Sequence, residues 1–163
     1  MRPDFAIRPA RSSDAPALAR LRFALRSRPT NVESEQDFFE RCASWMSKAL
    51  AQENWRCWVA EDNERVVAAL WLQLIEKIPN PVAEAECHGY ITNFFVAESA
   101  RGNALGSRLL AEVLDWCRQQ RSSKGPKINS IVLWPTERSR SLYKRQGFDV
   151  SSDVFELVLG TKR

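Results

Sequence analysis

The sequence lacks the residues to build a metal site from cysteine and histidine. It has one histidine, and its four cysteines lie far apart, with no C-x-x-C pair among Cys42, Cys57, Cys87 and Cys117. A structural zinc site needs four such ligands at characteristic spacings. We therefore expect no metal, and we expect the cysteines to be free thiols of a protein in a reducing compartment.

Long apolar stretches and runs of one charge are also missing. No segment approaches the roughly 20 apolar residues that span a bilayer, and residues 1–14 lack the apolar core of a signal peptide. Lysine and arginine are interspersed with aspartate and glutamate, so no basic stripe indicates nucleic-acid binding. These features predict a cytoplasmic protein with neither a membrane nor a nucleic-acid partner. The net charge of +4 suits an anionic ligand.

The composition that remains is typical of a single globular domain spanning residues 1–163. The chain is 44% hydrophobic and 27% charged, and it is long enough to bury most of its apolar surface. Strand and helix patterns alternate, which predicts an α/β fold. We expect strands at 5–10, 55–62, 65–78, 84–96, 128–134 and 148–159, with helices at 12–25, 38–49, 105–117 and 136–146. The strands 55–62 and 65–78 should form a hairpin about Asp62-Asn63.

One turn suggests a ligand. Gly102 and Gly106 lie within five residues, between the end of the strand 84–96 and the start of the helix 105–117. Backbone N–H groups at a helix N-terminus are free and attract anions, and glycine lets a ligand approach them closely. The spacing matches neither a P-loop nor a dinucleotide fingerprint. The pattern alone is compatible with an anion site or with a turn that needs glycine for its geometry.

Two segments together resemble a known family. "FFVAESARGNALGSRLL" is similar to the acyl-CoA-binding motif of the GCN5-related N-acetyltransferases, in which Arg/Gln-x-x-Gly-x-Gly/Ala follows a strand. "VLWPTERSRSLYKRQGF" is similar to the family's later motif, with a Leu-Tyr pair before a Gly-Phe. The resemblance covers nearly the whole chain. It implies a mixed, mostly antiparallel sheet that is splayed between its fourth and fifth strands and flanked by helices.

The same resemblance implies a site for acetyl-CoA as the acyl donor. Its pyrophosphate would lie on the backbone N–H groups of Arg101, Gly102, Asn103, Ala104, Leu105, Gly106 and Ser107. The pantetheine would pair with the main chain of Phe94, Phe95 and Val96. Thr136 would begin the later helix and contribute a hydrogen bond. Two of these positions depart from the family's pattern, because glycine is usual at Ala104 and asparagine is frequent at Thr136.

The resemblance implies one catalytic residue, and the strand pattern adds two candidates. Tyr143 would be the general acid that protonates the departing thiolate, although an aromatic residue on a helix often serves packing alone. Glu86 and His88 lie two apart on the strand 84–96 and point to one face, so either would be a base or relay for the amine's proton. The competing interpretation is that Glu86 and His88 belong to a solvated strand face.

We thus expect direct transfer of an acetyl group to a primary amine, with a small molecule favoured as the acceptor. Two alternatives remain open: an enzyme that acetylates a protein or peptide, and a non-catalytic acyl-CoA sensor. A homodimer is compatible with the sequence, which leaves open the oligomeric state and whether the apolar terminal segment "VFELVL" pairs across two copies.

Overall fold

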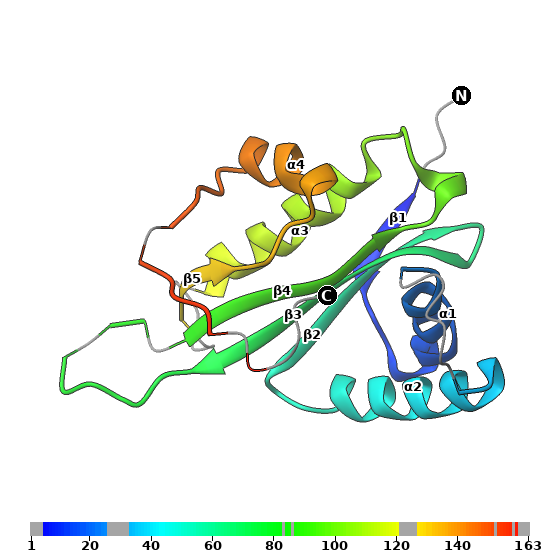
Figure 1. The fold of residues 1–163 in the computed structure, drawn as a ribbon, viewed down its shortest axis with the longest axis horizontal. Coiled ribbons are helices and arrows are strands. Elements are labelled where there is room, and N and C mark those ends of the chain that lie inside the picture. The colour runs from blue at the N-terminus through cyan, green and yellow to red at the C-terminus, as the bar shows by residue number, and fades with distance from the viewer. Residues whose placement is uncertain are drawn as a thin grey trace.

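The fold is a mixed sheet between two layers of helices (Figure 1). The computed structural model describes residues 5–25, 33–82, 84–85, 87–120, 127–151, 153–157 and 159. The strands are β1 (Ala6–Pro9), β2 (Trp55–Asp62), β3 (Arg65–Glu76), β4 (Cys87–Val96) and β5 (Ile128–Val132). The helices are α1 (Ala15–Leu25), α2 (Glu35–Leu50), α3 (Leu105–Gln119) and α4 (Arg140–Arg145), with short 3-10 turns η1 (Ser12–Asp14), η2 (Glu98–Ala100) and η4 (Glu137–Ser139).

The described strands follow one another across the sheet in chain order. β1 to β4 form an antiparallel meander, and β5 joins β4 in parallel. The crossover between these parallel strands carries α3, as a parallel connection requires. The sequence-based prediction of a mixed, mostly antiparallel sheet is confirmed.

Alternation along β4 separates the two faces of the sheet. Cys87 and Ile91 are buried against α3 in the larger core cluster, which places His88, Tyr90 and Thr92 on the opposite face. α1 and α2 cover that opposite face through a second cluster that includes Leu18, Met46 and Trp71. β3 is central, and its residues 67–72 are buried throughout. The four cysteines are free thiols.

The hairpin turn and the last predicted strand differ from expectation. The two residues of the β2–β3 turn are Asn63 and Glu64, with φ of 47° and 64°, one position later than predicted. The described residues within 148–159 form no strand, so that prediction is wrong for this structure. The segment has the composition of a strand, but a strand needs a hydrogen-bonded neighbour. The described residues of this segment pair with no strand, and β5 is the edge of the described sheet. No helix in the described part of the chain is long and apolar enough to cross a membrane.

A buried carboxylate ties β1 to the start of α1. Asp14 accepts bonds from both terminal nitrogens of Arg8, at 2.8 and 2.9 Å, and from the backbone N–H of Arg11. Arg8 also pairs with Glu61 of β2. These hydrogen bonds, that from Arg8 first, hold the pKa of Asp14 below its ordinary value. The network fixes the entry of the first helix on the sheet.

Replacing Asp14 with alanine should lower the free energy of unfolding at pH 7 by about 2–3 kcal/mol, because Arg8 and the Arg11 N–H lose a largely buried acceptor. Denaturant titration measures the change. Because the folded pKa is depressed, the wild-type advantage should shrink as the pH falls below 3.8, where the unfolded carboxyl takes up a proton. Asp115→Ala removes only an exposed pair with Arg118 and is the control, with an expected change under about 0.5 kcal/mol. Equal losses from the two variants would contradict this account.

Candidate active site

The sheet opens between β4 and β5. These strands pair only from Cys87 to Tyr90, where Tyr90 lies opposite Val132, whereas β4 stays paired with β3 as far as Val96. Among the described residues, no strand therefore pairs with the main chain of residues 91–96 on its β5 side. The predicted splay between the fourth and fifth strands is present.

A bulge in β4 accompanies this divergence. Trp71 pairs with Thr92 and Ala69 pairs with Phe95, so Asn93 and Phe94 together face the single residue Leu70. Asn93 has a φ of 50°, which asparagine tolerates better than most residues do. Its side-chain oxygen accepts a hydrogen bond from Arg22 of α1 at 3.3 Å. The first helix thus holds the residue at which β4 bends.

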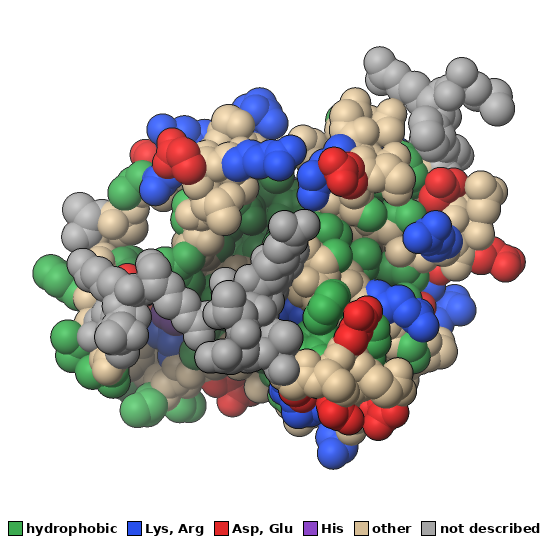
Figure 2. Space-filling model, turned by 45° about the vertical axis from the view of Figure 1, so that its right-hand side comes forward, with side chains coloured by type: hydrophobic (Ala, Val, Ile, Leu, Met, Phe, Trp, Pro, Cys, Tyr) green, Lys and Arg blue, Asp and Glu red, His purple; other side chains and the backbone are tan. Residues whose placement is uncertain are grey.

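The N-terminus of α3 lies against the end of β4. A Cβ added at Gly106 would meet the side chains of Phe94 and Val96 at 3.7 Å and that of Leu142 at 3.9 Å. The first turn of α3, the open part of β4 and α4 therefore converge here. Figure 2 shows hydrophobic side chains on the floor of a hollow in the surface, with lysine and arginine side chains along its upper rim.

The amides at this helix end are not capped by a side chain. The N-cap residue is Ala104, no acidic side chain occupies the first turn, and the backbone N–H of Arg108 is bonded to the carbonyl of Ala104. The N–H groups of residues 105–107 precede that bond and have no partner within the helix. Together with the helix dipole, they form a site suited to phosphate.

The loop before α3 folds back on β4 and adds positive charge. Arg101 donates from Nε to the carbonyl oxygen of Val96 at 3.1 Å, and its guanidinium lies 5.8 Å from the centre of the Phe95 ring. Asn103 donates to the carbonyl of Arg101. Gly102 has a φ of 80° with open space where a Cβ would be. The loop thus leaves room for a ligand beside the free amides.

Tyr143 of α4 packs against the end of β4. It is 8% exposed, and its ring packs 6.4 Å from Phe94 and 5.6 Å from Phe148, centre to centre. Gly147, at a φ of 90°, ends α4 so that the Phe148 N–H bonds to the Tyr143 carbonyl. The described part of the chain gives the Tyr143 hydroxyl no hydrogen-bond partner. Burial raises the pKa of this phenol to about 12, so the hydroxyl keeps its proton and remains a donor.

The candidate base lies elsewhere on the strand. His88 Nδ1 is 2.8 Å from the Ser130 hydroxyl, in the part where β4 and β5 are paired. Six residues of strand, roughly 20 Å, separate His88 from Phe94 beside Tyr143. The structure therefore does not bring His88 next to Tyr143. Glu86 lies outside the described residues.

An aromatic pair at the fork of the two strands was missed by sequence reasoning. Tyr90 is the last residue of β4 paired with β5, and its ring lies 5.2 Å from that of Trp134, which follows β5. Trp134 is largely exposed. The sequence holds six tryptophans, and nothing in its pattern distinguishes this one from those in the core.

A sequence model of the acetyltransferase (GNAT) family matches residues 18–148, well over half of the chain. The chain belongs to this family. Sequence comparison with curated proteins finds no match. The acetyltransferase nonetheless has many structural neighbours, and their identities, below 25%, show the fold alone.

Three neighbours illustrate the likeness. A GCN5-related N-acetyltransferase from Ralstonia eutropha JMP134 has a TM-score of 0.74 at 24% identity, over 96% of this chain and 100% of the other. A predicted acetyltransferase with acetyl-CoA from Clostridium acetobutylicum has a TM-score of 0.74 at 22% identity, over 96% and 97%. Glucosamine-6-phosphate N-acetyltransferase from Arabidopsis thaliana has a TM-score of 0.68 at 17% identity, over 96% and 99%.

The residues of this acetyltransferase fit an acyl-CoA donor. The uncapped amides of α3 suit a pyrophosphate, and the open side of residues 91–96 suits a chain of amides. Thr136 precedes η4, and its hydroxyl donates to Ser139 Oγ at 3.0 Å instead of capping the turn. The departure at Ala104 has a clear cost, because its φ of 55° lies in the left-handed region, where glycine is favoured.

Replacing Ala104 with glycine should raise the free energy of unfolding by about 0.5–1 kcal/mol, because relief of left-handed strain exceeds the added entropy of the unfolded chain. Thermal or denaturant unfolding measures it. Ala111→Gly, in the middle of the same helix, is the matched control and should lower the free energy of unfolding by about 1 kcal/mol. A loss of stability in both variants would show that Ala104 is not strained.

Proposed function

We propose that this acetyltransferase moves the acetyl group of acetyl-CoA directly to the primary amine of a small molecule. The observation that supports this most is the convergence of three features: the free amides of α3, the open side of β4 and the protonated Tyr143. They are joined through contacts among Gly106, Phe94 and Leu142. The free thiols further support a cytoplasmic site of action.

The donor would lie along the open strand. The N–H groups of residues 102–107 would hold its pyrophosphate, with the Arg101 guanidinium adding charge, and the main chain of Phe94 to Val96 would bond its amides. The expected contact from the Arg101 N–H is not available, because this group donates to the Glu98 carbonyl at 3.2 Å. Bound in this way, acetyl-CoA supplies an activated thioester carbonyl beside β4. The Val96 carbonyl already accepts from Arg101 Nε, so this carbonyl and the loop are held together before binding.

Tyr143 would protonate the thiolate as it leaves. Its hydroxyl is free to donate, and a pKa of about 12 keeps it protonated at neutral pH. The ring is held by Phe94 on one side and Phe148 on the other, so the donor atom has a fixed place beside the open strand. A preorganised donor lowers the barrier without reorientation during the reaction.

The attacking amine must lose a proton. His88 and Glu86 remain our candidates for base or relay, and Ser130 fixes the His88 ring through Nδ1, which leaves Nε2 for a proton. Roughly 20 Å of strand separates His88 from Phe94 beside Tyr143, which exceeds the reach of one bridging water, so His88 would serve only the outer end of a proton relay. A relay of this kind accepts the proton on the acceptor's side of the sheet.

The acceptor would enter on the face that carries His88, Tyr90 and Thr92. At the fork, Trp134 and Tyr90 offer aromatic surface to an incoming ammonium group, a favourable contact before deprotonation. The Arabidopsis neighbour is named for an amino-sugar phosphate, which suggests where to begin among small amines. A peptide or protein acceptor is the alternative outcome of the same test.

Tyr143→Phe should reduce kcat by about 10²–10³-fold, because the thiolate loses its acid. The measurement is thiol release from acetyl-CoA with a panel of amino sugars, polyamines, amino acids and short peptides. Acetyl-CoA affinity by calorimetry should be unchanged and serves as the control for folding. Since Tyr143 holds its proton until the pH nears 12, any basic limb in the wild-type profile below that pH should persist in the variant's residual activity.

Two results would contradict the proposal. Wild-type kcat retained in Tyr143→Phe would remove the tyrosine from the mechanism. Tight acetyl-CoA binding without turnover on any amine or peptide would favour a sensor.

Trp134→Ala should raise KM for the amine several-fold while leaving KM for acetyl-CoA unchanged, because only acceptor contacts are lost. Steady-state kinetics with each substrate varied in turn separates the two constants. Trp45→Ala is the control, since Trp45 is a half-exposed tryptophan of α2 that packs against Trp55 and Trp71 and lies away from Tyr90 and Trp134 in the chain. If both KM values rise together, Trp134 does not contact the acceptor selectively.

A further inference from the structure

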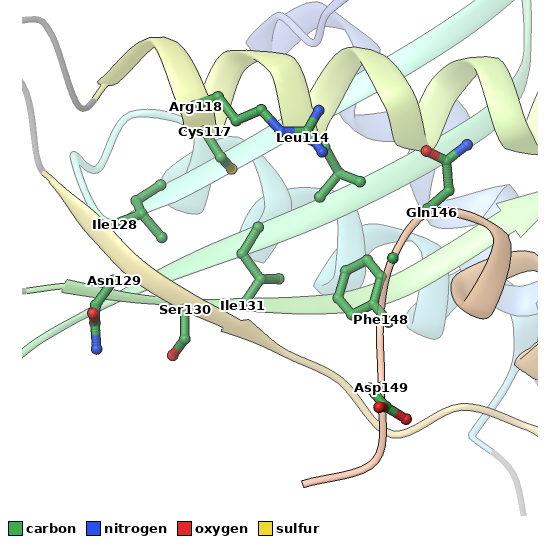
Figure 3. A pocket seen from close by; sticks show the side chains of 11 residues that line it. Leu114, Cys117, Arg118, Ile128, Asn129, Ser130, Ile131, Gln146, Phe148 and Asp149 are labelled. Atoms are coloured by element: carbon green, nitrogen blue, oxygen red, sulfur yellow. The ribbon is translucent and has the colours of Figure 1, made fainter.

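The two ends of the fork between β4 and β5 are held from different layers. At the paired end, Ile128 and Ile131 of β5 point toward Leu114 of α3 across a cavity of about 340 Å³ (Figure 3). Of the described residues that line this cavity, none belongs to β4. The side-chain hydrogen bond that reaches the bulge in β4 comes from the other face of the sheet, where α1 lies (Figure 1).

The bulge at Asn93 reverses the alternation of side chains along β4. Before it, Ile91 and the other odd-numbered residues face α3. Beyond it, the even-numbered Phe94 and Val96 face α3, since a Cβ at Gly106 would meet both side chains at 3.7 Å. The extra residue of a bulge has this effect because side chains of a strand alternate with a period of two. The bulge therefore decides which side chains of the open stretch reach α3.

The same change of register decides which main-chain groups a ligand can reach. Arg101 Nε donates to the Val96 carbonyl at 3.1 Å from the open side. The next N–H, that of Ala97, donates to a carbonyl of β3 at 2.8 Å. Successive residues of an antiparallel strand turn their main-chain groups to opposite sides, so those of Phe94 share the open side with those of Val96. Without the bulge, a slip of one residue would turn the groups of Phe95 there instead.

The bulged conformation of Asn93 is stabilised by Arg22. The Asn93 φ of 50° lies in the left-handed region, which even asparagine enters less readily than the extended region. Nη1 of Arg22 donates to the Asn93 side-chain oxygen at 3.3 Å, and a charged donor strengthens such a bond. Burial raises the pKa of the Cys42 thiol in α2, and the charge of Arg22 opposes that rise. Arg22 thus lies close to α2 as well as to the bulge.

We propose that Arg22 is a positioning residue for the acetyl donor. By holding Asn93 in its bulged conformation, it keeps the main-chain groups of Phe94 and Val96 on the open side of β4, where the amides of the pantetheine would bond. Arg22 acts through Asn93 and makes no contact with the donor. The inference rests on the proposed donor site along β4. It gives α1, which covers the opposite face of the sheet, control over the register of the strand that binds the donor.

The first test is a double-mutant cycle measured as the dissociation constant of acetyl-CoA by calorimetry, which needs no acceptor amine. Arg22→Gln should weaken binding about tenfold, because a hydrogen bond from a charged donor is lost. In an Asn93→Gly background, Arg22→Gln should change the constant less than about twofold, because glycine permits the left-handed φ but removes the acceptor through which Arg22 acts. Arg20→Gln, at an exposed position of α1, is the charge-matched control and should bind as wild type does.

Circular dichroism checks that each variant is folded. A folded Arg22→Gln variant that binds acetyl-CoA as tightly as wild type would overturn the proposal. An equal loss of affinity in both backgrounds would also overturn it, since Arg22 would then act without Asn93. Absence of binding by the wild type would remove the proposed donor site and this inference together, whereas the kinetics of Tyr143→Phe test the reaction separately.

The second test follows the strand itself, without a ligand. In hydrogen exchange, peptides that cover residues 91–97 should exchange several-fold faster in Arg22→Gln than in wild type, because the bulge is released. Peptides that cover β2 should exchange at the wild-type rate and are the internal control. Equal exchange of residues 91–97 in the two proteins would contradict the proposal. Faster exchange throughout the sheet would also contradict it, since Arg22 would then support the fold in general and not the bulge.

Discussion

The candidate site depends on one constraint: β4 must remain paired with β3 to its end while it parts from β5. The bulge at Asn93 accompanies this, and the hydrogen bond from Arg22 holds the bulge from the opposite layer. Because β4 stays paired with β3 on one side and is open on the other, its main chain can bind a ligand while it remains part of the sheet. The helix α3 and the aromatic Tyr143 then need only be packed against that open stretch.

The partial positive charge at the start of α3 has no acidic side chain beside it in the first turn of the helix. An ordinary helix start would carry a serine or aspartate cap, but α3 begins after an alanine and has no acid in its first turn. Such an end favours an anion because, in the described part of the chain, no side chain caps its amides. The buried phenol nearby is the opposite case, since it is kept neutral by its surroundings and not by a charged partner.

The sequence predicts most of the helices and strands and the opening between β4 and β5. The strong periodicity of α2 and α3 predicted these helices, and the glycines at 102 and 106 marked the turn before α3. The splay was implied by the family resemblance that the two motifs carry. The bulge at Asn93 and the φ of Ala104 could not be predicted, because they follow from long-range pairing and packing. His88 lies on the same strand as Phe94, but its distance from the open part of β4 is known only from the register of β4 with β5. The apolar composition of residues 154–159 predicts a strand. Whether the strand forms depends on a second strand to pair with it, and composition does not identify that partner.

The two-residue turn at Asn63 and Glu64 has a consequence for how the sheet assembles. Residues 67–72 of β3 are buried on both faces, so a slip of one residue against β2 would still bury apolar side chains and would meet little resistance from the hydrophobic pattern. The positive φ of both turn residues fixes the offset of the two strands instead. Correct alignment of the central hairpin therefore rests on two exposed turn residues, of which Asn63 tolerates the left-handed region better than Glu64 does.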